Sequence, residues 1–354
     1  MKPISTIVMA CVVLCVPSTP VSFADSSPAA HHGGKVFLNP YTDNGKTGFF
    51  GIIRARLSND WIAYDKSRDI VPTSNPEFLP SGTSSNNATV TWIGHASVLI
   101  QHQGVNVLTD PMFSDFASPV SFAGPKRITR PAIEQEDLPT IHAVVISHDH
   151  YDHLDVSSVK QLGNTPTYFV PLGIKRWLLK RGIDAARIVE MDWWEETQLS
   201  VAGVDLTLTS TPAQHFSGRG LFNRDQTLWT SWSIAWADFH VWFGGDTGYN
   251  DVQFKQIGAR LGPIDLGIIP IGAYKPRWFM QTVHVDPREA VQIHRDIGAK
   301  QSIGIHWGAF VLSGEGVLTP PQDLVKARTP LAMPQSEFDV LAVGETLHFQ
   351  GRTL

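Results

Sequence analysis

Four side chains that can bind metal ions lie within six consecutive residues: His148, His150, Asp152 and His153. They follow residues 143–146, a short apolar run that predicts a buried strand. Residues two apart in an extended segment point the same way, so His148 and His150 can converge on one cation, and Asp152 and His153 can face a second after the chain turns. Imidazoles and a carboxylate without a thiolate favour zinc in a site kept open for chemistry. The alternative is a polar surface turn that happens to hold three histidines, and the preceding strand argues against it.

The motif resembles the signature of the metallo-β-lactamase superfamily. The superfamily pattern continues with an isolated histidine, an aspartate and a final histidine, each placed after a strand. Residues 206–210, 241–245 and 302–305 are predicted strands, and the candidates that follow them are His215, Asp246 and His306. A functional residue commonly lies where a strand gives way to a loop, because the strand holds it rigidly.

Further stretches resemble one branch of that superfamily, the N-acylphosphatidylethanolamine-hydrolysing phospholipases D. The resemblance covers nearly everything from residue 89 to 321. It rests on TWIGHAS (91–97), TDP (109–111), GPKR (124–127), FVPLG (169–173), DWWEE (192–196), LWTSW (228–232), IPIGAY (269–274), PRWFM (276–280), HVDP (284–287) and IHWG (305–308).

The resemblance implies an α/β fold, the four-layer αββα metallo-β-lactamase sandwich, and a cofactor of two Zn²⁺. One zinc would be held by His148, His150 and His215, the other by Asp152, His153 and His306, and Asp246 would bridge them. Residues 148–153 are called the metal loop below. Asp110 is expected to support this loop through hydrogen bonds, without binding a metal itself.

The resemblance also implies a reaction, in which a phosphodiester is attacked by water activated between the two metals. Asp152 and His284 are the candidate catalytic residues, with His284 protonating the leaving group. A structural, hydrogen-bonded histidine is the alternative for His284. Tyr151, inside the motif, is a candidate to line the metal pocket.

The implied activity is hydrolysis of N-acylphosphatidylethanolamine to phosphatidate and an N-acylethanolamine. A lactonase or another ester or amide hydrolase of the same fold is one alternative. A non-catalytic, metal-binding exported protein is an alternative of another class, although a purely structural zinc needs no open position.

A lipid substrate needs an apolar approach to the metals. Residues 49–64, 216–232 and 278–280 are the stretches that can supply one, and the side chains singled out are Phe222, Trp229 and Trp278. Trp229 lies on a predicted strand, where a core role is the alternative. Phe222 lies among glycines and Asn223, which predicts a loop.

The composition is that of a globular protein, with 42% hydrophobic and 17% charged residues among 354. The formal charge of −5 gives no basic footprint for nucleic acid, so the expected partner is a phospholipid or another small ester, with peripheral membrane contact. The sequence does not decide the oligomeric state, and a homodimer is an open alternative.

Residues 1–24 read as a signal peptide, which predicts export to the periplasm or cell envelope. Lys2 is the only charge before Asp25, residues 4–16 are apolar, and small residues at 22 and 24 suit cleavage after Ala24. A lipoprotein anchored at Cys11 is the second choice, because the apolar stretch before it is very short.

Residues 25–88 are expected to be an N-terminal extension, and residues 89–354 the catalytic domain. Residues 25–44 should be a mobile lead-in in which His31 and His32 are solvated. From residue 50 to 64 the apolar spacing predicts an amphipathic helix that packs on the body, caps the site or touches lipid. Residues 73–87 look like a linker.

In the catalytic domain, strands are predicted at 89–93, 97–101, 105–109, 143–146, 167–170, 197–201, 204–210, 229–237, 239–245, 266–269 and 302–305. Helices are predicted at 156–162, 173–180, 252–261, 287–297 and 321–326. Strands followed by helices in two similar halves suit two packed sheets with helices outside.

Overall fold

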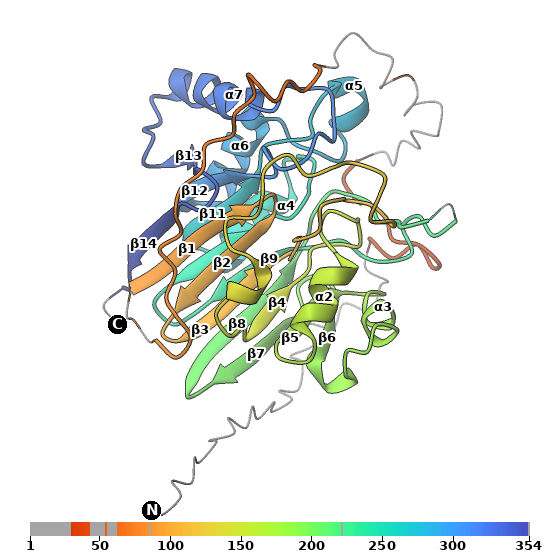
Figure 1. Ribbon diagram of the computed structural model, residues 1–354, viewed down its shortest axis with the longest axis vertical. Coiled ribbons are helices and arrows are strands. Elements are labelled where there is room, and N and C mark those ends of the chain that lie inside the picture. Colours follow the sequence, from red (N-terminus) through yellow and green to blue (C-terminus); the bar gives the residue numbers. More distant parts are fainter. Residues whose placement is uncertain are drawn as a thin grey trace, which may run out of the picture.

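Two seven-stranded sheets packed face to face form the centre of the protein, and helices cover their outer faces (Figure 1). The computed structural model describes residues 30–42, 54, 62–83, 85, 87–220 and 222–352. The two sheets and their helices make the four-layer αββα sandwich, so the predicted fold class is confirmed.

The first sheet has the order β14-β1-β2-β3-β4-β5-β6. Its strands are β1 (Asn87–Gly94), β2 (Ser97–His102), β3 (Val105–Thr109), β4 (Ala143–Val145), β5 (Thr167–Pro171), β6 (Ile188–Met191) and β14 (Thr346–Gln350). Strands β1 to β3 pair antiparallel, and β3 to β6 pair parallel. Parallel neighbours need crossover connections, and α2 (Val156–Leu162) and α3 (Lys175–Leu179) lie within two of them.

The second sheet repeats this plan in the order β13-β12-β11-β10-β9-β8-β7. Its strands are β7 (Glu196–Val201), β8 (Val204–Thr211), β9 (Ser231–Ala235), β10 (His240–Phe243), β11 (Ile264–Pro270), β12 (Ala299–Ile305) and β13 (Phe338–Val340). Strands β7 to β10 pair antiparallel, and β10 to β13 pair parallel. The helices of this half are α4 (Gln253–Leu261), α5 (Arg277–Met280), α6 (Pro287–Ile297) and α7 (Thr319–Arg328).

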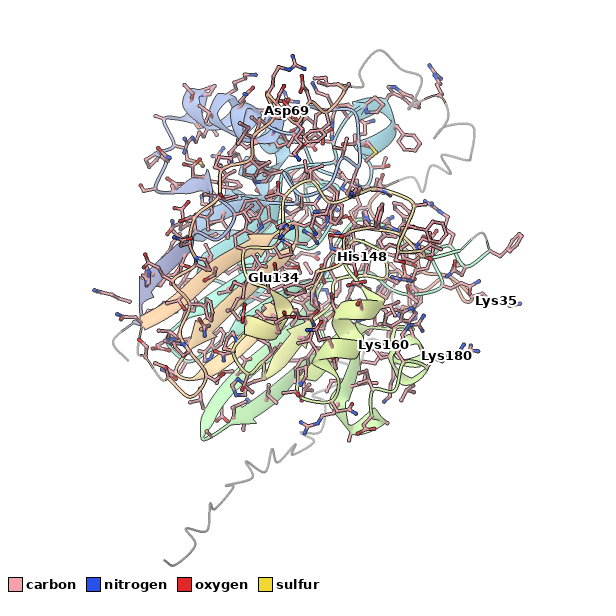
Figure 2. All side chains as sticks on the ribbon, in the orientation of Figure 1. Lys35, Asp69, Glu134, His148, Lys160 and Lys180 are labelled. Carbon is pink, nitrogen blue, oxygen red and sulfur yellow. The ribbon has the colours of Figure 1, made fainter. Side chains whose placement is uncertain are left out.

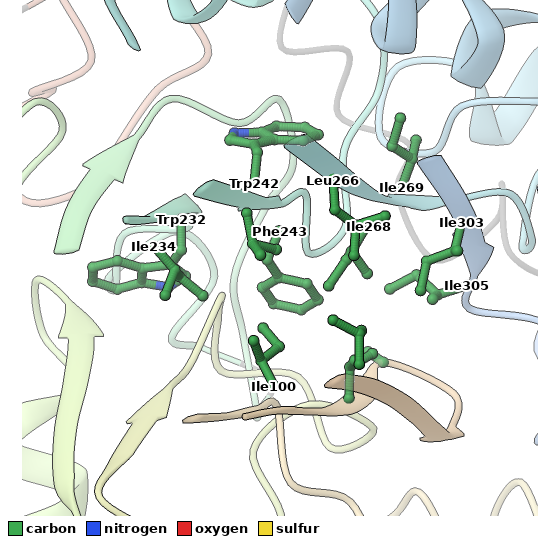
Figure 3. Packing of buried hydrophobic residues seen from close by; sticks show 14 of the residues in the cluster. Ile100, Trp232, Ile234, Trp242, Phe243, Leu266, Ile268, Ile269, Ile303 and Ile305 are labelled. Carbon is green, nitrogen blue, oxygen red and sulfur yellow. The ribbon is translucent and has the colours of Figure 1, made fainter. Parts of the chain in front are cut away.

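The central strands are buried on both faces, which explains their continuous apolar runs. In β10, Trp242 and Phe243 point to opposite sides of the sheet (Figure 3). Trp242 meets Phe254 of α4 edge to face, with ring centroids 6.1 Å apart. Phe243 points into the space between the sheets, where Ile100 of β2 also packs (Figure 3).

Local signals set the helix ends. Asp286 begins α6 by accepting hydrogen bonds from the amides of Arg288 and Glu289, while the Glu289 side chain accepts from the Asp286 amide. Gly298 ends α6 in the left-handed conformation, with φ 64°. Capping of this kind explains why residues 287–297 could be predicted to their ends.

Every helix and strand predicted between residues 89 and 326 is present, with ends shifted by a few residues. Strand β9, for example, begins at Ser231, so Trp229 precedes it. Besides three short 3-10 helices, three strands and one α-helix of the described residues were not predicted: β6, β13, β14 and α5. They are short, at three to five residues each, and a run of that length carries little periodicity.

The prediction that residues 25–44 form a mobile lead-in is wrong for the described residues 30–42, which pack on the body, and the prediction of solvated histidines is wrong for His31, whereas His32 is exposed. His31 is buried and stacks on Trp193, with ring centroids 4.1 Å apart. Its Nε2 lies 2.6 Å from one oxygen of Asp192, and His32 Nε2 lies 2.7 Å from the other. The partners lie about 160 residues away in the chain, so nothing local in the sequence indicates them.

The predicted signal peptide and most of the predicted helix at 50–64 lie outside the described residues. Where the chain is described again, Ile62 and Tyr64 are in coil, so the helix does not reach residue 64. The expected linker is also irregular but packs on the body, because Thr73 bridges Val343 and the Leu79 amide donates to Gln101. Among the described residues, no helix is long and apolar enough to cross a membrane.

Candidate metal centre

The predicted metal ligands converge because the strands that carry them end at one edge of the sandwich. His148, His150, Asp152 and His153 follow β4, His215 follows β8, Asp246 follows β10 and His306 follows β12. His148 lies near the middle of the view in Figure 2. The structure therefore brings together residues up to 158 positions apart in the chain (306 − 148).

The first cluster contains His148, His150, His215 and Asp246. Nδ1 of His150 lies 2.8 Å from Nε2 of His148 and 3.2 Å from Nε2 of His215. Oδ2 of Asp246 lies 3.9 Å from Nε2 of His148 and 3.7 Å from Nε2 of His215.

The second cluster contains Asp152, His153, His306 and a residue that sequence reasoning did not single out, His95. Oδ2 of Asp152 lies 3.4 Å from Nε2 of His153, 3.4 Å from Nε2 of His306 and 2.9 Å from Nε2 of His95. His95 follows β1 in a tight turn with φ 56°, and its carbonyl accepts a hydrogen bond from the His306 amide. Its place after a strand was the available signal, but the superfamily pattern used in the sequence reasoning did not include it.

Asp246 lies between the two clusters, which is the position that a bridging ligand needs. Besides its contacts in the first cluster, Oδ2 of Asp246 lies 3.2 Å from Nε2 of His153. Its other oxygen, Oδ1, lies 3.2 Å from Nε2 of His306.

The residues fit a bound cation. Nε2 of His153, Nε2 of His306 and Oδ1 of Asp246 are buried and have no hydrogen-bond partner within the described part of the chain. Buried polar atoms normally have partners, so these three atoms suit direct contact with a cation. Zinc–ligand bonds of about 2.0–2.1 Å in a tetrahedron place ligand atoms roughly 3.3 Å apart, and the separations of 2.8 to 3.9 Å bracket that value.

The electrostatics of the site also favour a cation. Burial holds the pKa of His148 and of His215 well below the usual histidine value, which keeps both imidazoles neutral and able to bind a metal. Burial opposes ionisation of Asp246, yet the positive charges of His153 and His306 outweigh it and hold the pKa of Asp246 well below its usual range. The carboxylates attract a proton onto His153, whose pKa they raise against the effect of burial, and a metal can take the place of that proton.

The predicted supporting role of Asp110 is confirmed. One of its oxygens accepts a hydrogen bond from the Ser147 amide at 2.7 Å, and the other lies 2.7 Å from Nδ1 of His153. Ser147 in turn lies 2.9 Å from Nδ1 of His148 through its hydroxyl. With Nδ1 engaged in this way, the Nε2 atoms of both histidines face the cluster.

A second supporting contact comes from the N-terminal segment. The side chain of Asn39 donates a hydrogen bond to the His215 carbonyl at 2.8 Å and accepts one from the His215 amide at 3.1 Å. Nδ1 of His215 is held 2.8 Å from the Val283 carbonyl. The backbone and the ring of this ligand are therefore fixed by residues far from it in sequence.

His284 lies beside the clusters. It is buried, and its Nδ1 lies 3.9 Å from Oδ2 of Asp246 with no hydrogen-bond partner in the described structure. Burial lowers the pKa of His284 to about 4. An unpartnered ring nitrogen facing the centre favours a functional role over the structural alternative.

Tyr151 is directed toward Arg219. Its hydroxyl donates to the Arg219 carbonyl at 2.6 Å, and the Arg219 guanidinium lies 3.9 Å from the centre of its ring. Arg219 also donates to the carbonyls of Asp149 and Leu154 at 2.7 Å each, so it secures the metal loop.

The three candidate lipid contacts have different surroundings. Phe222 is 91% exposed and Trp278 is 44% exposed, with the Arg54 guanidinium 4.7 Å from the Trp278 ring. Trp229 is 1% exposed in a cluster with Trp193 and donates to the Ala213 carbonyl. Its surroundings are those of a core residue, the alternative weighed from the sequence.

A profile described as "Beta-lactamase superfamily domain" matches residues 105–307. The chain belongs to this superfamily, in which the shared fold supports metal-dependent hydrolysis. It is 40% identical over 307 residues to N-acyl-phosphatidylethanolamine-hydrolyzing phospholipase D 1 of Caenorhabditis elegans, which covers 83% of this chain and 86% of that protein.

A second sequence relative and a solved structure are consistent with membership of this superfamily. The mitochondrial N-acyl-phosphatidylethanolamine-hydrolyzing phospholipase D of Saccharomyces cerevisiae is 36% identical over 238 residues, covering 66% of this chain and half of that protein (50%). Among solved structures, the metallo hydrolase Igni18 of Ignicoccus hospitalis matches with a TM-score of 0.55 at 21% identity, covering 75% of this chain and 100% of that one. The latter likeness concerns the fold alone.

Replacing Asp246 by Asn should weaken metal binding in both clusters together, because its carboxylate faces both. We expect affinity to fall at least about tenfold for each metal, measured as metal content per chain by elemental analysis after dialysis. Asp205→Asn, at the exposed start of β8, is the control and should keep its metals. Loss of only one metal would contradict the bridging position.

Gly272→Ala should displace a ligand without touching its side chain. A Cβ at residue 272 would collide with the backbone oxygen of His306. We expect reduced metal content and about 1–3 kcal/mol lower stability in thermal unfolding. Gly220→Ala, whose new Cβ would meet only the flexible end of Asn223, is the control. Normal metal content in Gly272→Ala would mean that His306 tolerates the shift.

Proposed function

We propose that this protein is a dizinc phosphodiesterase of phospholipase D type that releases an N-acylethanolamine and phosphatidate from N-acylphosphatidylethanolamine. The observation that carries the proposal is the convergence of all seven predicted ligands in a chain 40% identical to a phospholipase named for this substrate. His148, His150 and His215 would hold one zinc, Asp152, His153 and His306 the other, and Asp246 would serve both.

Bound zinc ions lower the pKa of water and offset the charge of a phosphodiester at neutral pH. The residues of this chain contribute the remaining functions. Asp110 and Ser147 keep the imidazoles of His148 and His153 in the orientation that binds metal. His95, 2.9 Å from Asp152, orients that carboxylate from the other side of the cluster or adds a further ligand.

The leaving group of this reaction is an alkoxide, which needs a proton. We assign the proton transfer to His284, whose buried ring faces Asp246 without a hydrogen-bond partner among the described residues. Because burial lowers its pKa to about 4, the ring is neutral before the reaction, and it would take the proton of the attacking water and pass it to the alkoxide.

A diacyl substrate resides in a membrane, so peripheral contact with lipid is part of the proposal. Exposed apolar side chains such as Phe222 and Trp278 would make that contact. The apolar N-terminal run and its small residues at 22 and 24 support a location outside the cytoplasm.

An assay of purified protein against four substrate classes tests the activity: N-acylated phosphatidylethanolamines, plain phospholipids, lactones and β-lactams. We expect turnover of the first class at a rate well above the others, and loss of turnover after metal chelation with recovery on adding zinc. Preferential lactone or β-lactam turnover would assign the site to acyl carbon chemistry. Metal binding without turnover of any class would indicate a binding protein.

Phe222→Ala should lower turnover of a long-chain lipid by about tenfold while sparing a short soluble phosphodiester. The reason is that burying a phenylalanine side chain against acyl chains contributes about 1.5–3 kcal/mol. The measurement is kcat/KM on both substrates. Leu331→Ala, an exposed apolar residue beside α7, is the control. Equal losses on both substrates would exclude this route for the lipid.

A further inference from the structure

A cavity of about 850 Å³ next to the metal loop is lined by an excess of positive charge. It lies between α3, the two residues that precede α3 (173 and 174), and residues 219, 223, 226 and 227. Five cationic side chains line it: Lys175, Arg176, Lys180, Arg181 and Arg219. Two acidic residues, Asp149 and Glu190, lie among them, although the whole chain carries a net charge of −5.

The two acidic groups are engaged by backbone amides. One oxygen of Glu190 accepts hydrogen bonds from the amides of Gly173 and Lys175 at 2.8 and 2.9 Å. An oxygen of Asp149 accepts from the Gly218 amide at 2.7 Å. Within the described ranges, none of the five cations forms an ion pair, so their charge is not neutralised by the protein.

Aromatic rings hold two of the arginines in place. The Arg181 guanidinium lies 3.7 Å from the centre of the Trp177 ring, and the Arg219 guanidinium lies 5.1 Å from the same ring. Arg181 donates one hydrogen bond, to the Trp177 carbonyl, while its buried Nε has no partner in the described structure. A guanidinium stacked on a ring keeps its plane fixed, which prepares its edge to bind an oxyanion.

We propose that this cavity binds a phosphate oxyanion, either free phosphate or the head group of a phosphomonoester. Planar arginines recognise phosphate through paired hydrogen bonds, and lysines add point charges around it. Lys180, one of the lining residues, extends outward beside α3 (Figure 2). This binding site is separate from the metal clusters and does not rest on the proposed reaction.

The cavity is also connected to the metal loop. Arg219 lines the cavity and donates to the carbonyls of Asp149 and Leu154, on either side of His150 and Asp152. Arg219 would therefore contact both a bound anion and the backbone of the segment that carries four of the predicted metal ligands.

Calorimetric titration of the metal-loaded protein with inorganic phosphate tests the proposal. Phosphate can also bind at the metals, so the cavity is identified by variants that leave the metals untouched. Arg181→Gln and Lys180→Gln should each weaken binding by about tenfold, the value of one charge-assisted hydrogen bond, and added salt should weaken wild-type binding. Lys255→Gln on α4 removes an equivalent exposed charge elsewhere and should bind like wild type.

Lys180 is exposed, so its replacement keeps the test valid if Arg181→Gln fails to fold. Unchanged affinity in Lys180→Gln and in any folded Arg181→Gln protein would overturn the proposal, as would an equal loss in Lys255→Gln or no binding by wild type. Binding of the protein to vesicles of phosphatidate or of phosphatidylcholine distinguishes a lipid head group from free phosphate as the bound anion. Retention on phosphatidate vesicles alone, lost in the cavity variants, identifies a lipid head group, whereas calorimetric binding without retention identifies soluble phosphate.

Discussion

The structure depends on placing one buried carboxylate, Asp246, and one partly buried carboxylate, Asp152, among seven imidazoles in a space a few ångströms across. Asp152 and Asp246 lie within 4 Å of several ring nitrogens, and the buried Oδ1 of Asp246 lacks a hydrogen-bond partner in the described structure. Buried charge of this kind is costly unless it is compensated, and a metal cation compensates it where water cannot enter. The strands that precede the ligands, β4, β8, β10 and β12, all end at one edge of the sandwich, so two rigid sheets hold the ligands close together.

The same demand explains the contacts around the ligands. A histidine that binds a metal almost always has its other ring nitrogen in a hydrogen bond that fixes the ring, and Asp110, Ser147 and the Val283 carbonyl supply these contacts here. Gly245, with φ 58°, brings its backbone so close to Ser147 that a Cβ would collide with that side chain. The support of the metal centre is therefore shared between both halves of the sandwich.

Sequence reasoning succeeded where the signal was local and failed where it was not. The ligands of the β4 motif could be predicted because their spacing is compact, and α6 because its capping residues flank it. His95, Arg219 and Asn39 were missed as supporting residues, since each acts through partners 57 to 176 residues away. The pairing of His31 and His32 with Asp192, and the burial of His31, were missed for the same reason, because the carboxylate belongs to a distant loop.

The attachment of residues 30–42 has a practical consequence for anyone who shortens the protein. The sequence invites trimming at residue 44, before the predicted helix, on the view that everything earlier is leader and spacer. Such a cut would remove Asn39, whose side chain forms hydrogen bonds with both the amide and the carbonyl of His215. A shortened protein could then be well expressed and soluble yet poorly loaded with metal, and its inactivity would be mistaken for the wrong choice of substrate.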